Sequence, residues 1–120
     1  MCVRVLVADD VEIIRRGIKS LLKNRDDIFV IGEASNLSET IQKTAELLPD
    51  VVIIDLRMTD GADRGLSLTG PTVVAISFAN DEIAKAQAER LGAAKFIDKM
   101  DLAEELIPAL LQFASSNKPS

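Results

Sequence analysis

Short apolar runs alternate along the chain with longer segments in which apolar residues recur every three or four positions. The runs are rich in Val and Ile and stop at polar or turn residues, which is typical of buried strands. We therefore expect strands at Val3–Ala8, 28–33, Val51–Asp55, Thr72–Ser77 and 94–97. The segments with the longer period predict amphipathic helices over residues 11–23, 37–48, 81–91 and 102–113.

The second of these helices carries the clearest boundary signals. Asn36, followed three residues later by Glu39, has the pattern of a capping box, and Pro49 is expected to end the helix. Asp81 and Gly92 are expected to cap the next helix at its two ends. In the second helix the apolar residues predict a buried face formed by Leu37, Ile41, Ala45 and Leu48.

The stretch between the third and fourth strands is the least regular part of the chain. Residues 56–70 are rich in Asp, Gly, Ser and Thr and predict at most one helical turn, over residues 66–69. Strands that alternate with helices imply an α/β fold, with a parallel sheet covered on both faces through right-handed crossovers. We expect a three-layer, doubly wound, flavodoxin-like sheet of five strands in the order 2-1-3-4-5, whose switch point lies between strands one and three.

Composition and charge narrow the class of protein. The 120 residues, 48% of them hydrophobic, predict one domain over residues 1–114 and a polar tail over 115–120. A net charge of −5 without a basic stripe argues against direct binding of nucleic acid. We expect a cytoplasmic protein that does not enter the membrane, because no apolar run reaches membrane-spanning length and no signal-peptide pattern opens the chain. The absence of histidine excludes imidazole nucleophile pairs, histidine metal ligands and a role as phosphohistidine donor.

Polar residues that can carry chemistry stand at four predicted strand ends. Asp9 and Asp10 follow the first strand and Asp55 ends the third, while Ser77 ends the fourth and Lys99 lies just past the fifth. The carboxyl ends of parallel strands meet at one edge of a sheet, so these groups are expected to lie together. Three carboxylates there would repel one another unless a cation or a proton lay among them.

This set of groups matches phosphoryl transfer. Carboxylate oxygens suit Mg²⁺, or Mn²⁺ as its substitute, and such a cation neutralises charge on an incoming phosphoryl group. Lys99 supplies a positive charge and Ser77 a hydrogen-bond donor for other phosphoryl oxygens. Asp55 is then the nucleophile, with Lys99 and Ser77 as its catalytic partners.

The same residues resemble those of the receiver domains of two-component response regulators, the CheY-like family, over nearly the whole chain. The residues that carry the resemblance are Asp9-Asp10, Asp55 followed by Leu56-Arg57-Met58, Ser77, and Phe96-Ile97-Asp98-Lys99. The stretches 4–10 and 31–34 are similar to receivers of the NarL/LuxR-type subfamily.

The resemblance implies a cofactor and partners. Mg²⁺ would be held by Asp10, Asp55 and the backbone carbonyl of Arg57, with Asp9 close by or bound through water. A sensor histidine kinase or a phosphotransfer protein would donate the phosphoryl group to Asp55. Association into a homodimer is a further partnership that the resemblance allows.

A conformational switch is also implied by the resemblance. Ser77 would move toward the phosphoryl group, and Phe96 would turn inward into the space that is vacated. Phosphorylation would thereby reshape the face formed by the helix over residues 81–91 and the strand over 94–97.

The sequence departs from the family pattern at three positions. Ser77 follows Asp55 by only 22 positions, where the family has a full third helix, so we expect that helix to be truncated and one sheet face to be partly uncovered unless the loop or a partner covers it. Phe78 stands where the family favours a small residue, and its ring would slow access to Asp55. Met100 follows Lys99 where many members have proline, which weakens any expectation of a cis peptide bond there.

The same residues also have plainer interpretations. Asp9 and Asp10 could only cap the following helix, and Lys99 could be a solvated loop lysine. Phe96 on its own would be read as a core residue. Asp60 is a minor alternative metal ligand, because it lies close to Asp55 in the sequence.

Other functions remain open at this stage. The short third helix and Phe78 favour a degenerate receiver that acts as an interaction module without phosphorylation. A small aspartyl-phosphate hydrolase would use the same carboxylate, although the lack of a cap domain argues against it. A flavin-binding domain is disfavoured, because no phosphate-binding loop follows the first strand.

Overall fold

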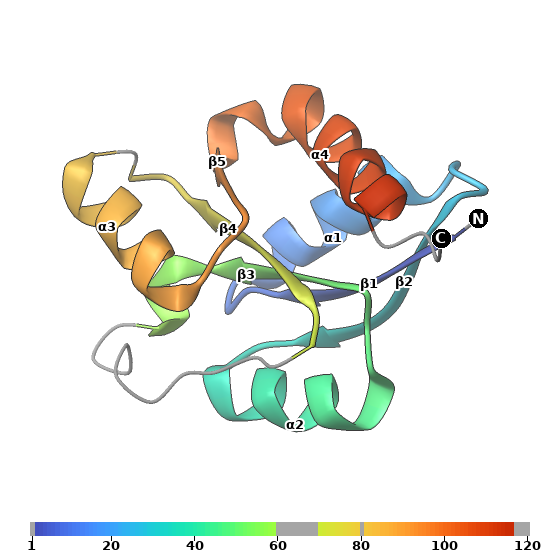
Figure 1. Ribbon diagram of the computed structural model, residues 1–120, viewed down its shortest axis with the longest axis horizontal. Helices are drawn as coiled ribbons and strands as arrows, with labels where there is room; N and C mark the ends of the chain where they lie inside the picture. The colour runs from blue at the N-terminus through green and yellow to red at the C-terminus, as the bar shows by residue number, and fades with distance from the viewer. Residues whose placement is uncertain (1, 60–69, 80, 117–120) are drawn as a thin grey trace.

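Five parallel strands form one sheet in the order β2-β1-β3-β4-β5, which confirms the predicted strand order (Figure 1). The computed structural model describes residues 2–59, 70–79 and 81–116, with side chains up to residue 113. Every neighbouring pair of strands is parallel. The strands are β1 (Val3–Ala8), β2 (Ile28–Ala34), β3 (Val51–Asp55), β4 (Thr72–Ser77) and β5 (Lys95–Asp98).

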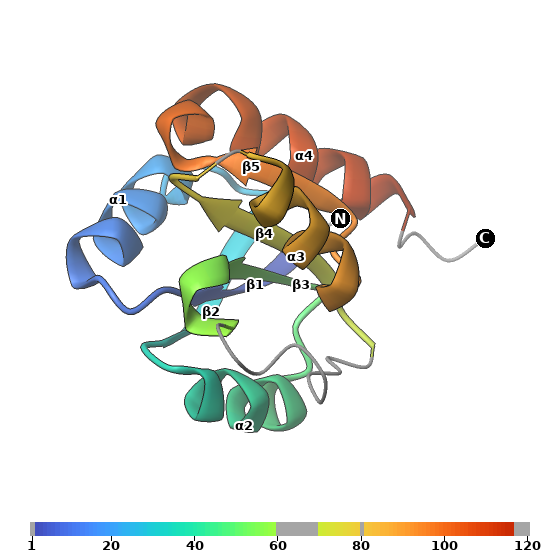
Figure 2. The ribbon, with the colours of Figure 1, turned by 90° about the vertical axis from the view of Figure 1, so that its left-hand side faces the viewer.

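Four α-helices cover the two faces of this sheet in the described part of the chain. They are α1 (Glu12–Leu22), α2 (Leu37–Leu47), α3 (Glu82–Leu91) and α4 (Leu102–Ser116), and two 3₁₀ turns, η1 (Leu56–Thr59) and η2 (Lys99–Asp101), follow β3 and β5. Helices α1 and α4 pack on one face, and α2 and α3 pack on the other (Figures 1 and 2). The predicted three-layer architecture is therefore confirmed.

Alternation along the strands divides the core into two layers. On β1, Val3, Val5 and Val7 face α1 and α4, whereas Leu6 and Ala8 face α2 and α3. The same alternation runs along β3 and β4, because successive side chains of a strand point to opposite faces. Strands that are buried on both faces appear in the sequence as continuous apolar runs, as these strands do.

The connection between β3 and β4 contains no α-helix within the residues that the structure describes. It begins with η1, and the single turn expected over residues 66–69 and the alternative ligand Asp60 both lie outside the described residues. The sheet face at this point is nevertheless buried, since Val52, Ile54, Val73 and Ala75 expose 4% of their surface or less. The predicted uncovered sheet face is therefore not observed at these positions.

Helix α2 presents a different face to the sheet from the one predicted. Ile41, Ala45 and Leu48 are exposed, whereas Thr40 and Thr44 are buried. Both threonines can be buried because their hydroxyls donate to backbone carbonyls one turn earlier, Thr40 to Asn36 and Thr44 to Thr40. The predicted face was wrong because it counted apolar residues only.

The end of α2 explains the exposure of Leu48. This residue takes a left-handed conformation with φ of 51°, so the chain leaves the helix before the Leu48 side chain can reach the sheet. Leu47 packs inward instead, and its Cδ1 lies 2.8 Å from the position that a Cβ on Gly32 would occupy. The helix therefore faces the sheet through Leu37, Thr40, Thr44 and Leu47.

The predicted capping signals are largely confirmed. Asn36 Oδ1 accepts from the Glu39 N–H at 2.8 Å, although the Glu39 carboxylate reaches back to the N–H of Ser35 rather than that of Asn36. Asp81 Oδ1 caps α3, and Gly92 ends that helix with φ of 81°.

The last helix is longer than expected. Helix α4 runs through Pro108 to Ser116, beyond the predicted end at residue 113. Residues 117–120 lie outside the described residues, so the boundary at residue 114 stays a prediction.

None of the described helices combines the length and the apolar character needed to cross a lipid bilayer.

The corrected face of α2 can be tested with two matched truncations. Leu47→Ala is expected to lower the free energy of unfolding by about 2 kcal/mol, because it removes a side chain packed between helix and sheet. Ile41→Ala, at a position that is 46% exposed, is expected to cost less than about 1 kcal/mol. Urea titrations measure the free energy of unfolding of both variants, provided that the m-values are unchanged. A larger loss for Ile41→Ala than for Leu47→Ala would show that the face predicted from the sequence is the buried one.

Candidate functional site

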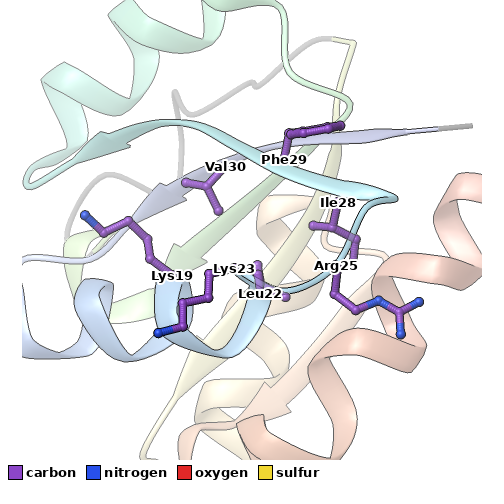
Figure 3. Close-up of a pocket in the computed structure, with 7 residues that line it drawn as sticks. All are labelled: Lys19, Leu22, Lys23, Arg25, Ile28, Phe29 and Val30. Carbon is purple, nitrogen blue, oxygen red and sulfur yellow. The ribbon is translucent and has the colours of Figure 1, made fainter.

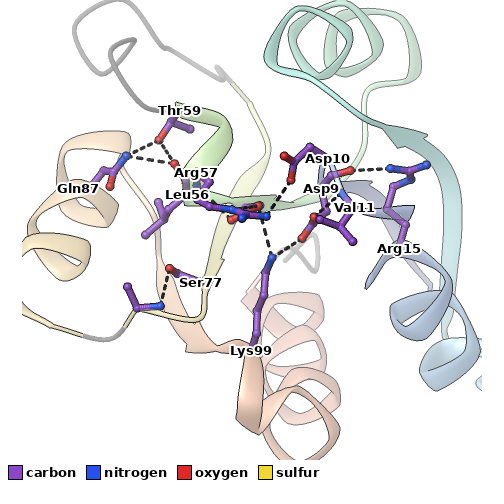
Figure 4. A network of polar contacts seen from close by, with 12 residues as sticks. Asp9, Asp10, Val11, Arg15, Leu56, Arg57, Thr59, Ser77, Gln87 and Lys99 are labelled. Atoms are coloured by element: carbon purple, nitrogen blue, oxygen red, sulfur yellow. Dashed lines mark hydrogen bonds and ion pairs between the residues drawn. The ribbon is translucent and has the colours of Figure 1, made fainter. Parts of the chain in front are cut away.

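The residues predicted to carry chemistry meet at the carboxyl edge of the sheet (Figure 4). The strand register brings the ends together: Ala8 pairs with Ile54 and Ser77 pairs with Asp98. The sharp turns that follow these strands then direct the polar side chains of Asp9, Asp10, Asp55 and Lys99 toward one another.

The three acidic residues form one cluster. Asp9, Asp10 and Asp55 each offer a carboxylate oxygen within 4.8 Å of the others. Asp9 and Asp55 are buried and Asp10 is exposed. The Oδ2 atoms of Asp9 and Asp55 are buried without a hydrogen-bond partner, and buried carboxylate oxygens of this kind call for a cation. A hard, oxygen-binding divalent cation fits this set of donors.

The Lys99 side chain is fully buried between two of these carboxylates. Its Nζ lies 2.7 Å from Asp9 Oδ2 and 3.4 Å from Asp55 Oδ2. These contacts are ion pairs without the geometry of directed hydrogen bonds, since both oxygens still lack a hydrogen-bond partner. The ammonium therefore neutralises part of the negative charge of the two buried carboxylates. The interpretation of Lys99 as a solvated lysine is wrong, because its side chain is buried.

Asp55 has two oxygens in different surroundings. Its Oδ1 accepts a hydrogen bond from the backbone N–H of Arg57 at 3.1 Å, which the tight η1 turn makes available. Burial raises the pKa of the Asp55 carboxyl above its ordinary value, while the Arg57 N–H and the charge of Lys99 act in the opposite direction. The carboxylate is thus held in place by the turn at Oδ1, while its buried Oδ2 lies between the charges of Lys99 and Arg57.

The Arg57 side chain takes part in the site, which the sequence did not indicate. Its guanidinium nitrogen NH2 lies 3.2 Å from Asp10 Oδ1, and its Nε lies 3.5 Å from Asp55 Oδ2. The pKa of Arg57 is raised by the charges of Asp55 and Asp10. The side chain is 58% exposed, so it closes the acidic cluster from the solvent side. The role predicted for the Arg57 backbone carbonyl stays a prediction.

Ser77 lies in the site but is turned to its own backbone. Its Oγ accepts a hydrogen bond from the Ala79 N–H at 3.0 Å. Phe96 is partly buried and packs against the core layer beneath α3. The predicted switch between Ser77 and Phe96 therefore stays a prediction, with this arrangement as one of its two states.

Phe78 stands beside the acidic cluster, as the sequence suggested. The centroid of its ring lies 5.1 Å from Lys99 Nζ, and the ring is exposed. A cation near an aromatic face at this distance is attracted by the ring. The peptide bond between Lys99 and Met100 is trans, as are the other described peptide bonds.

A network of charges supports the turn that carries Asp9, and sequence reasoning missed it. Arg15 donates to the Asp9 carbonyl at 2.7 Å and pairs with Glu33 at 3.1 Å, and Lys19 binds the same carboxylate at 2.6 Å. Asp9 Oδ1 accepts from the N–H of Val11. Helix α1 has no side-chain cap among the described residues, so the interpretation of Asp9 and Asp10 as mere helix caps is not supported.

Gln87 ties α3 to the turn after Asp55. Its Nε2 donates to the Leu56 carbonyl at 3.1 Å and to Thr59 Oγ1 at 2.8 Å (Figure 4). A cavity of about 190 Å³ lies next to this contact and is also lined by Ser77. The link thus joins the site to the helix that the predicted switch would move.

A basic hollow of about 280 Å³ lies between the end of α1 and the start of β2 (Figure 3). Its walls include Lys19, Lys23 and Arg25, but Lys19 pairs with Glu33 and Arg25 pairs with Asp27. The hollow lies at the amino end of β2 and contains none of the residues of the acidic cluster.

Comparison with known protein families decides the assignment. Residues 5–111 match the model of the response regulator receiver domain. The chain belongs to this family. The receiver is 36% identical to the transcriptional regulatory protein LiaR of Bacillus subtilis, over 98% of the receiver and 58% of LiaR. It is also 36% identical to a protein-glutamate methylesterase/protein-glutamine glutaminase of Methanococcoides burtonii, over 87% of the receiver and 32% of that protein.

Solved structures agree with this assignment and with the predicted NarL/LuxR-type resemblance. The response regulator domain of Thermotoga maritima CheB superposes with a TM-score of 0.83 at 28% identity, covering 99% of the receiver and all of that domain. The signal receiver domain of NarL from Mycobacterium tuberculosis superposes with a TM-score of 0.82 at 27% identity, covering 98% of both chains. The receiver spans about half or less of the length of several curated relatives it matches.

Removal of the buried ammonium tests how the acidic cluster is held. Lys99→Met is expected to lower the free energy of unfolding by about 3 kcal/mol, because two buried carboxylates lose their counter-charge. Urea unfolding in metal-free buffer measures the loss. The control is Lys95→Met at the start of β5, where the lysine is exposed and a change below about 0.5 kcal/mol is expected. Equal effects of the two substitutions would contradict this account.

The charges behind Asp9 predict a pH dependence. The hydrogen bond from Lys19, and then that from Arg15, lowers the pKa of Glu33 below its ordinary value of 4.5. A carboxyl with a lowered pKa stabilises the fold above that ordinary value, and the stabilisation is lost as the pH falls through the lowered pKa.

Glu33→Gln is therefore expected to cost about 1 kcal/mol at neutral pH and progressively less in acid; the loss is modest because the carboxylate is partly exposed. Urea unfolding of both proteins, from neutral pH to below the ordinary glutamate pKa of 4.5, measures the difference in the free energy of unfolding. Glu89→Gln, at an exposed position on α3, serves as the control. A difference that did not shrink in acid would exclude the ion pairs as its source.

Proposed function

We propose that this receiver accepts a phosphoryl group on Asp55 from a sensor histidine kinase or a phosphotransfer protein, with Mg²⁺ as cofactor. The observation that carries this function is the buried Asp55 Oδ2, which has no hydrogen-bond partner and faces Lys99 and two further carboxylates. A structural carboxylate would be expected to have its buried oxygens satisfied. An oxygen kept free beside a buried ammonium is suited to form a bond with phosphorus.

Each residue of the site has a defined task in this reaction. An Asp55 oxygen attacks the phosphorus of the donor, and the bond from phosphorus to the donor nitrogen breaks as the new bond to oxygen forms. Lys99 is placed to bind a phosphoryl oxygen, because its ammonium already lies 3.4 Å from Asp55 Oδ2. Ser77 would donate a hydrogen bond from its hydroxyl to another phosphoryl oxygen, after it gives up the hydrogen bond that it accepts from the Ala79 N–H.

The acidic cluster is the place for the cation. Asp10, Asp55 and the Arg57 carbonyl would hold Mg²⁺, with Asp9 close by or bound through water, and Mn²⁺ could replace it. When bound, the cation neutralises negative charge on the phosphoryl oxygens. The Oδ2 atoms of Asp9 and Asp55, which are buried without a hydrogen bond, support this placement.

The consequence of phosphorylation is proposed to be a signal rather than a metabolic product. The contact of Gln87 with the η1 turn supports transmission from Asp55 to α3, and movement of Ser77 and Phe96 would alter the face formed by α3 and β5. Homodimer formation and a cytoplasmic location are part of this proposal. The proposal does not include direct binding of nucleic acid by this domain, because its net charge is −5.

A degenerate receiver that works without phosphorylation is the second candidate. The observation that favours it is the Phe78 ring beside Lys99, where a bulky group can slow the approach of a phosphodonor. The hydrolase interpretation has no comparable support. The Asp55 Oδ2 atom, which lacks a hydrogen bond, and the Lys99 ammonium beside it favour the phosphorylated receiver over both.

Intact-mass measurement tests the proposed function directly. The receiver is incubated with a small acyl phosphate and Mg²⁺, and we expect a mass increase of one phosphoryl group that requires the metal. Asp55→Asn is expected to abolish the increase, while Asp50→Asn, at an aspartate outside the acidic cluster, is expected to retain it. A protein that remains unmodified with every donor, a sensor kinase included, would support the interaction module instead.

A further inference from the structure

The Arg57 guanidinium contacts an acidic cluster whose negative charge is only partly neutralised by Lys99. Asp9, Asp10 and Asp55 bring three negative charges within 4.8 Å, and Lys99 supplies one positive charge. Two negative charges are left, and Arg57 is the cation that contacts both Asp10 and Asp55 in the described structure. These two residues are also the carboxylates assigned to the metal in the proposed function.

We propose that the Arg57 side chain is an internal counter-ion that Mg²⁺ must displace, so that it sets the metal affinity of the receiver. The inference rests on the proposed metal site and adds a role for a side chain that metal binding through the Arg57 backbone would not require. Asp55 Oδ2 already lies against both Lys99 and Arg57, and a divalent cation added at Asp10 and Asp55 would repel the guanidinium that contacts the same two carboxylates.

The two cations of the site differ in how firmly they are held. The Lys99 side chain is 1% exposed and fixed between Asp9 and Asp55, so it cannot leave without opening the core. The Arg57 side chain is 58% exposed, and its contacts of 3.2 and 3.5 Å are at the long end for charged pairs. Arg57 can therefore swing into solvent at small cost, while its backbone N–H continues to hold Asp55 Oδ1.

Displacement makes a specific thermodynamic prediction. Without metal, loss of the guanidinium leaves the acidic cluster short of one positive charge and destabilises the fold. With saturating Mg²⁺ the guanidinium has already left the acidic cluster, so its removal should not change the stability of the fold. Two cations that compete for the same oxygens each lower the affinity of the other. Removal of the Arg57 guanidinium should therefore raise the affinity for the metal.

Calorimetric titration with Mg²⁺, repeated with Mn²⁺, tests the proposal on the full chain. Arg57→Gln keeps most of the side-chain length without the charge, and it is expected to bind Mg²⁺ about 5-fold more tightly than the unmodified protein. The Mg²⁺ affinity of Arg57→Lys is expected to lie between the two, because the charge is kept but a single nitrogen replaces the separate NH2 and Nε that contact Asp10 and Asp55. Arg25→Gln makes the same change of charge at a residue paired with Asp27, outside the acidic cluster, and should leave the affinity unchanged.

Thermal unfolding supplies a readout that does not depend on the binding titration. In a chelator, Arg57→Gln is expected to melt about 3 °C below the unmodified protein. In saturating Mg²⁺ the two should melt together, which a merely structural arginine would not produce.

The outcomes separate the proposal from the function on which it rests. If the unmodified protein binds Mg²⁺ and Arg57→Gln binds it equally well or more weakly, the displacement is wrong and the metal site stands. Absence of Mg²⁺ and Mn²⁺ binding in both proteins would overturn the displacement together with the metal part of the proposed function.

Discussion

The site depends on one buried ammonium. Lys99, which directly follows β5, extends past the end of β4 to lie between the carboxylates of Asp9, directly after β1, and Asp55, at the end of β3. Two buried carboxylates on neighbouring strands would not be tolerated without such a charge, because burial of an unpaired ion costs several kcal/mol. The lysine therefore fixes the relation of three strands at the carboxyl edge, and the rest of the site is arranged around that constraint.

Around this ammonium the site has a fixed half and a movable half. Arg15 and Glu33 hold the turn after β1, and Gln87 holds the turn after β3, so the buried acids keep their positions. Asp10 and Arg57 lie on the exposed rim, where charges can exchange partners at little cost. A site built in this way would keep Asp55, the proposed phosphoacceptor, in place and leave its solvent side to the exposed Asp10 and Arg57 side chains, which can move.

The strand ends could be predicted from the sequence because each depends on a local pattern, an apolar run that stops at a polar residue. The sheet order then placed Asp55 and Lys99 at one edge without any knowledge of side-chain contacts. The buried face of α2 could not be predicted in this way, since Thr40 becomes tolerable in the core only when its hydroxyl finds a backbone carbonyl. The Arg57 side chain was missed for a related reason: its partner Asp10 lies 47 positions away in the sequence.

The energetic scale of the site bears on how a phosphoryl group could switch it. Ser77 is held in its present state by one hydrogen bond from the Ala79 N–H, and such a bond contributes about 1 kcal/mol net. Because Ser77 Oγ is the acceptor in that bond, its own proton remains available for donation. A phosphoryl group on Asp55 would add a charge of roughly −1.5 to −2 and three acceptor oxygens within a buried setting. A hydrogen bond from the Ser77 hydroxyl to a charged phosphoryl oxygen would contribute about 1.5–3 kcal/mol. This exceeds the cost of releasing Ser77 from the Ala79 N–H, so the proposed phosphorylation is sufficient in energy to move the hydroxyl.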